Sequence, residues 1–242
     1  MPTSPSESLR LLAFGAHPDD IEFGVGGIIA HHTQSGGSAH FVICSRGESA
    51  THGTPAERES EATEAARLLG ASVEFVDLGG DAHLAPGVPH TLALAALLRR
   101  HRPRWVLAPT TQAGQHPDHV VVGGLVRDAA RLARYGGVDE LRELPPHTID
   151  QLLHYAVGPE GEPAGEAPVW FDVSEPAVLA AWTAAMKTHA TQARSRDYVE
   201  LQLTRARLLG LRAGTSHLQA LYPAEPMVMT SLEQLGRGAR RF

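Results

Sequence analysis

The chain has 242 residues, 43% hydrophobic and 20% charged, a composition typical of a globular protein. This length fits one large α/β domain, so we expect residues 1–242 to form a single domain. The formal net charge of −6 offers no basic surface for a phosphate backbone, and we expect no nucleic-acid partner. The single cysteine, Cys44, excludes an intrachain disulfide. The sequence has no signal-peptide core and no apolar stretch of about 18 residues, which predicts a cytoplasmic protein without a membrane partner.

The first half of the chain alternates apolar runs with amphipathic stretches. Four runs are typical of strands buried on both faces of a sheet, namely residues 9–15, 39–45, 72–78 and 104–110. Between them, helical periodicity appears over residues 21–29, 62–69 and 92–98, and Gly36 and Gly70 stand where helices end. This alternation predicts an α/β, Rossmann-like three-layer fold with a mostly parallel sheet. Its ligands would bind in loops at the carboxyl ends of the strands.

The second half is less regular. We expect residues 1–134 to form the regular Rossmann-like half and residues 135–242 to complete it with further strands and helices. Residues 151–157 and 169–173 are typical of strands, and a helix is expected to begin at Ser174 as its N-cap. A second long helix is expected over residues 195–214.

The segment "AHPDDIEFG" follows the first predicted strand. His17 and Asp20 stand three residues apart at a strand-to-helix junction, a spacing that lets both side chains reach one point while Asp19 points elsewhere. A divalent cation there would make two adjacent carboxylates favourable rather than repulsive. The alternative is that Asp19 or Asp20 only caps the following helix.

A second motif, "GQHPDHVVVG", follows the predicted strand 104–110. It supplies His116, Asp118 and His119, and two such loops at one sheet edge argue against simple helix caps. One of these two imidazoles, with His17 and Asp20, makes a site of two histidines and one carboxylate with an open position, as in catalytic zinc sites. Such a site also accepts iron(II). The spacing does not choose between His116 and His119.

The remaining groups of the two motifs suit catalysis. Asp19, as a non-ligand, could act as general base toward a water. The histidine of the second loop that does not bind metal could stabilise an oxyanion or donate a proton to the leaving amine. Asp118 is placed to orient a histidine.

With these motifs the chain resembles the LmbE-like, or PIG-L, family of zinc-dependent de-N-acetylases, which act on N-acetylglucosamine conjugates. The segments "GESATHGTPAERESEATEAARLLG" and "HATQ" are also similar to segments of the family. The resemblance implies that His17, Asp20 and His119 hold zinc, that Asp19 is the base, and that His116 is the stabiliser or acid. The layout is similar to the bacillithiol-type deacetylases, which hydrolyse N-acetylglucosaminyl-malate.

Further residues are candidates for substrate contact. The resemblance implies that Arg58 and Asp81 approach the sugar and that Glu48 lies beside the metal loop, while Tyr155 is a candidate from its place near a strand end. It also implies a small amino-sugar substrate and a homo-oligomer, which in the bacillithiol type is often a hexamer. Gly114 and the segment "SHLQALYPAEPM" depart from the family pattern, so the aglycone stays open.

The sequence thus predicts a zinc-dependent hydrolase that removes acetyl from an N-acetylated amino sugar. One alternative is the same fold acting on a different small-molecule amide. Another is a non-catalytic domain that binds sugar or metal, against which Asp19 argues because it is not an expected ligand. The "GVGG" stretch, Gly24–Gly27, is interpreted as close helix-to-sheet packing, since the turn that a dinucleotide would need is taken by the acidic motif.

Overall fold

A computed structural model describes residues 10–240 of the chain. The strands are β1 (Arg10–Gly15), β2 (Ser38–Ile43), β3 (Ala71–Phe75), β4 (Trp105–Pro109), β5 (Gln151–Tyr155), β6 (Val169–Asp172) and β7 (Leu218–Pro223). The α-helices are α1 (Asp20–Gln34), α2 (Pro55–Leu68), α3 (Val88–His101), α4 (Pro117–Ala133), α5 (Pro176–Thr188) and α6 (Tyr198–Ala213). Short 3₁₀ helices are η1 (Asp139–Leu141), η2 (Pro159–Gly161), η3 (Gln192–Arg194) and η4 (Leu232–Gln234).

The strands form one sheet in the order β3-β2-β1-β4-β5-β7-β6. Strands β1 to β5 pair in parallel, whereas β7 runs antiparallel to both β5 and β6. The predicted α/β fold with a mostly parallel sheet is confirmed. Strands β5, β7 and β6 of the second half extend the sheet of the first half at its β4 edge.

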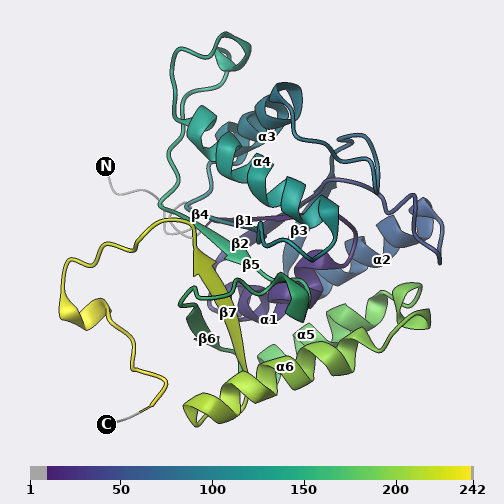
Figure 1. Cartoon of the computed structure of the whole chain (residues 1–242), viewed down its shortest axis with the longest axis vertical. Helices are drawn as coiled ribbons and strands as arrows, with labels where there is room; N and C mark the ends of the chain where they lie inside the picture. Colours follow the sequence, from purple (N-terminus) through teal and green to yellow (C-terminus); the bar gives the residue numbers. More distant parts are fainter. Residues whose placement is uncertain (1–9, 241–242) are drawn as a thin grey trace.

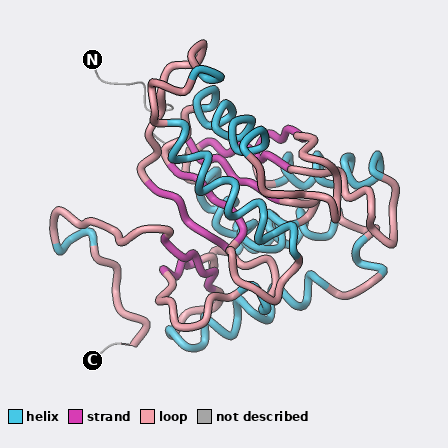
Figure 2. The backbone as a smooth tube through the Cα atoms, turned by 45° about the horizontal axis from the view of Figure 1, so that its top comes forward, coloured by secondary structure: helices cyan, strands magenta, loops and turns pink. Residues whose placement is uncertain are grey.

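Helices cover both faces of the sheet. Helices α3 and α4 lie on one side, and α1, α2, α5 and α6 lie on the other (Figure 1). The two faces carry separate apolar clusters, one that includes Val42, Leu94 and Val126 and one that includes Phe41, Ile29 and Trp182. After β7 the chain continues as a mainly irregular segment that carries η4 (Figure 2). No helix within residues 10–240 is both long and apolar enough to cross a membrane.

Three details differ from the sequence predictions. Strand β3 is only half-buried, not buried on both faces, because it lies at the edge of the sheet. Ser174 is not the N-cap of α5. The helix begins one residue later, with Glu175 at the cap, and the Ser174 hydroxyl instead contacts Thr215. Strand β7 was not predicted, although its burial is high, because its sequence lacks a clear alternation.

Glycines in α1 let two bulky side chains approach the helix. A Cβ at Gly24 would lie 2.3 Å from the ring of Tyr155 in β5, and a Cβ at Gly26 would lie 2.5 Å from the ring of Trp182 in α5. Trp182 is fully buried, and its indole Nε1 donates to the Glu22 carbonyl at 2.7 Å. The packing of these glycines is therefore helix-to-helix as well as helix-to-sheet.

We predict that Gly26→Ala destabilises the protein by about 1–3 kcal/mol, because the added methyl group forces the buried indole to move. The matched control is Gly124→Ala in α4, where no atom lies within 4 Å of the place that the added methyl group would take. This control is expected to raise stability by about 0.5–1 kcal/mol through helix propensity. Urea unfolding measures both, and equal stabilities for the two variants would contradict the packing argument.

Candidate metal and catalytic site

The first loop of the site joins β1 to α1. Asp19 is the N-cap of α1 and has φ 122° and ψ −27°, a conformation that costs a non-glycine residue about 1–3 kcal/mol. The neighbouring Asp20 carboxylate accepts hydrogen bonds from the backbone amides of Ala16 and His17, at 2.8 and 2.9 Å. These bonds fold the loop back on the helix start, so His17, Asp19 and Asp20 are held at the carboxyl end of β1.

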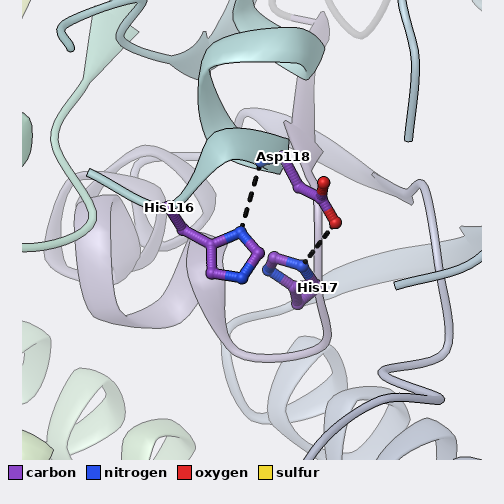
Figure 3. A group of neighbouring side chains, drawn as sticks. All are labelled: His17, His116 and Asp118. Carbon is purple, nitrogen blue, oxygen red and sulfur yellow. Dashed lines mark hydrogen bonds and ion pairs between the residues drawn. The ribbon is translucent and has the colours of Figure 1, made fainter. Parts of the chain in front are cut away.

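The second loop joins β4 to α4 and meets the first. His116 is the N-cap of α4, and its Nδ1 accepts the Asp118 backbone amide at 3.2 Å. The Asp118 carboxylate points toward His17, with Oδ2 3.2 Å from His17 Nε2 (Figure 3). Across the loops, His119 Nε2 lies 3.0 Å from Asp20 Oδ1. The two His-Pro-Asp motifs therefore converge on one point.

A third loop, after β3, brings Asp81 to the same histidine. Asp81 Oδ1 lies 3.1 Å from His17 Nε2, so this nitrogen faces two carboxylates, while His17 Nδ1 lies 3.6 Å from Asp20. The loop is tied down by Asp118, which accepts the Ala82 amide at 2.7 Å, and by Glu48, which accepts the Asp81 amide at 2.9 Å.

The donor set of His17, Asp20 and His119 fits a divalent metal. One potential ligand atom from each residue lies within 4.8 Å of the others, and their exposed fractions are 7%, 2% and 9%. The possible ligand atoms of His17, His116 and Asp118 also lie within 4.8 Å of one another. This second group is less suited to hold a buried metal ion, because His116 is exposed. Two imidazoles and a carboxylate are a ligand set of catalytic zinc sites, and they also suit iron(II).

The charges around this group favour a cation. Burial opposes ionisation of Asp20, but His119 and His17 outweigh it and hold the pKa of Asp20 well below its usual range. Burial lowers the pKa of His17, yet Asp20, Asp118 and Asp81 raise it more, so the net shift is well upward. Carboxylates thus crowd around His17 in a buried site, an arrangement that a bound dication would stabilise.

Asp19 is held apart from the donor set by Arg58. Arg58 in α2 is buried, and its Nη2 donates to Asp19 Oδ2 at 3.2 Å and to the Pro18 carbonyl at 2.9 Å. Burial raises the pKa of the Asp19 carboxyl to about 6, with Arg58 opposing the rise. Asp19 is therefore ionised at neutral pH but close to a pKa at which it can accept and release a proton.

A cavity of about 440 Å³ opens onto this group, a volume that suits a small ligand. Of the predicted residues, it is lined by His17, Asp19, Asp20, Arg58, Asp81, His116 and His119. Arg58 nevertheless directs its guanidinium to the Gly47 carbonyl as well as to Asp19, and so it joins loops of the protein itself.

Two predicted substrate contacts are placed differently. Tyr155 is fully buried and its hydroxyl donates to the Phe14 carbonyl at 2.8 Å, so the prediction that it contacts substrate is wrong. A strand-end tyrosine of the central sheet is covered by α1, which the sequence position does not reveal. Glu48 is exposed but is not among the residues that line the cavity, and both of its carboxylate oxygens accept backbone amides.

The sequence did not single out the far wall of the cavity. This wall is formed by η2, η3 and the start of α6, and it includes Glu160, Gln192, Arg196 and Tyr198. The Tyr198 ring stacks on Phe23 of α1, with centroids 5.0 Å apart and planes 16° apart. Gln192 ends the segment "HATQ", whereas Glu160, Arg196 and Tyr198 belong to no motif, and folding brings all four opposite the metal-binding loops.

The chain is similar to known enzymes over about half of its length. The model of the PIG-L family, described as GlcNAc-PI de-N-acetylase, matches residues 12–130. A 4-oxalmesaconate hydratase of Pseudomonas putida is 34% identical over 138 residues, which cover 52% of this chain and 53% of the relative. A 1D-myo-inositol 2-acetamido-2-deoxy-alpha-D-glucopyranoside deacetylase of Mycobacterium bovis is 33% identical over 148 residues, 48% of each chain. The chain thus spans about half the length of these curated relatives.

The similarity to a solved structure extends over nearly the whole chain. The crystal structure of the conserved protein TT1542 from Thermus thermophilus has a TM-score of 0.78 at 32% sequence identity. The match covers 92% of this chain and 97% of that one.

We predict that Asp118→Asn weakens zinc binding at the site of His17, Asp20 and His119 about 10- to 100-fold. The reason is that an amide side chain orients His17 less well than a carboxylate. The matched control is Asp128→Asn, an exposed position on the same helix, which should bind zinc as the wild type does. Calorimetric titration of the metal-free proteins measures both. Unchanged affinity in Asp118→Asn would show that this contact does not support the site.

Proposed function

The chain belongs to the PIG-L family, and from this premise we propose that it is a zinc-dependent hydrolase that removes the acetyl group of an N-acetylglucosamine conjugate. The observation that carries the proposal is the buried set of His17, Asp20 and His119 beside a carboxylate, Asp19, that pairs with Arg58 instead of joining the set. A metal-storage or sugar-binding domain has no need for a buried base in this place. N-Acetylglucosaminyl-malate, the substrate of the bacillithiol type, is the first conjugate to test.

His17, Asp20 and His119 would hold the metal. When bound, zinc supplies Lewis acidity that polarises an amide carbonyl and acidifies water. Asp19, with its raised pKa, accepts the proton that the water loses as its oxygen bonds to the carbonyl carbon. The carbon–nitrogen bond then breaks and the proton passes to the amine, leaving acetate and the free amino sugar.

His116 is the group of the cavity wall that can donate toward the reacting carbonyl. Its Nδ1 accepts the Asp118 amide, so the neutral ring carries its proton on Nε2. Burial lowers the pKa of His116, and electrostatic interaction with the neighbouring His17 and His119 lowers it further, which favours the neutral ring at neutral pH. An Nε2–H donor in this position stabilises the oxyanion of the tetrahedral intermediate.

Asp118 and Asp81 act by positioning His17 and the loop after β3. Asp118 and Asp81 hold His17 from its Nε2 side, and through Ala82 and Ser49 they also set the loop after β3 against the site. Neither carboxylate is required to touch the substrate for this role. The cytoplasmic location stays a prediction of the sequence, and the homo-oligomeric state stays an expectation from the resemblance to the bacillithiol type.

A second candidate function is hydration of a carbon–carbon double bond. It is favoured by the similarity to the Pseudomonas putida hydratase at 34% identity. The same base and donor set could direct water to an unsaturated acid in place of an amide. Arg196 in the cavity lining could bind the carboxylate of such an acid, although Glu160 lines the same cavity.

We predict that Asp19→Asn lowers kcat for acetate release about 100- to 10,000-fold while the protein still binds zinc. Asparagine is nearly isosteric and tolerates positive φ, so the loop should keep its shape. Acetate is measured with N-acetylglucosaminyl-malate, its inositol analogue and N-acetylglucosamine, with Asp128→Asn as the control. Full activity in Asp19→Asn would remove this residue from the role of base.

The two candidate functions predict different products from one zinc-loaded preparation. Deacetylation releases acetate and a primary amine from an N-acetylglucosamine conjugate, and a chelator abolishes the release. Hydration consumes the absorbance of 4-oxalmesaconate without releasing acetate. Turnover of the unsaturated acid together with inert acetylated sugars would replace the deacetylase proposal with the hydratase.

A further inference from the structure

A second group of metal-binding side chains lies outside the catalytic cavity. It consists of His40 in β2, Glu74 in the edge strand β3 and His101, the last residue of α3. In the parallel pairing of β2 with β3, His40 lies opposite Ser72, and Glu74 lies two residues further along. None of the three residues lines the catalytic cavity.

Both histidines of this group point at one oxygen atom. Glu74 Oε1 lies 3.0 Å from His40 Nε2 and 2.6 Å from His101 Nε2. The two imidazole rings stack with centroids 4.4 Å apart and planes 22° apart. The three possible ligand atoms lie within 4.8 Å of one another, and the side chains are 20%, 31% and 27% exposed, so a metal ion could reach them.

Ser72 completes the surroundings of His40. Its hydroxyl lies 2.7 Å from His40 Nδ1, on the side of the ring away from Glu74. When Nδ1–H donates to this hydroxyl, Nε2 has a free lone pair, which is the state that binds a metal.

The place of His101 also suits a cation. It is the C-terminal residue of α3, where the helix dipole places partial negative charge. Around tetrahedral zinc, nitrogen and oxygen ligands lie about 3.3 Å apart, as follows from bonds of about 2.0–2.1 Å. The observed nitrogen-to-oxygen distances are shorter, so binding needs the imidazoles to move outward by some tenths of an ångström, which partly exposed side chains allow.

We propose that His40, Glu74 and His101 form a second zinc site, separate from the catalytic centre, which clamps the edge strand β3 to β2 and to the end of α3. The ligands are two imidazole nitrogens and one carboxylate oxygen, and water completes the coordination. The role is structural, because none of the pockets found among the described residues is lined by a member of the cluster.

The test is zinc stoichiometry of the metal-free full-length protein by equilibrium dialysis and elemental analysis. We expect two equivalents in the wild type and one in each of His40→Gln and His101→Gln. The control His31→Gln, an exposed histidine at the end of α1, should keep two. His119→Ala should lose only the catalytic equivalent, so failure of the proposed function and failure of this site give different results.

Ser72→Ala provides a variant that leaves all three ligands in place. It should weaken the second equivalent about 10-fold or more without changing the first, because only the orientation of His40 is affected. Circular dichroism melting of the metal-free variants checks that they fold. A single equivalent in the wild type, or two in both His40→Gln and His101→Gln, would overturn the proposal.

Discussion

The Asp20 carboxylate connects the parts of the site that the fold brings together. One oxygen accepts two amides of its own loop, and the other lies against His119 of the second loop. The starts of α1 and α4 are therefore held at one point at the carboxyl ends of β1 and β4. Because its oxygens are shared in this way and it is only 2% exposed, Asp20 can serve both the backbone and a metal.

The adjacent Asp19 has different neighbours from Asp20, and its pKa is therefore shifted in the opposite direction. Asp20 faces two histidines and its pKa is lowered, whereas Asp19 is buried next to Arg58 and its pKa is raised to about 6. Two neighbouring carboxylates thus separate into a group suited to bind a cation and a group suited to carry a proton. The two side chains have different partners, Arg58 for Asp19 and the two histidines for Asp20.

The two histidine-rich groups differ in burial more than in composition. His17, Asp20 and His119 are buried beneath a cavity, where a bound metal would meet a substrate. His40, Glu74 and His101 are partly exposed between two strands and a helix end, where a metal would join elements of the fold. A metal there would stabilise the edge strand β3, which within residues 10–240 pairs only with β2.

The sequence by itself determined the layered α/β fold, the two loops and the candidate ligands, because each depends on local order. Apolar runs alternate with amphipathic helices, and each His-Pro-Asp motif directly follows a strand. Tertiary structure alone decided which side chains from distant parts of the sequence contact one another. It buried Tyr155 beneath α1, paired Arg58 with Asp19 and brought Asp81 to His17. It also built the far cavity wall from η2, η3 and α6. These contacts join residues distant along the chain, and local patterns carry no information about which distant side chains will meet.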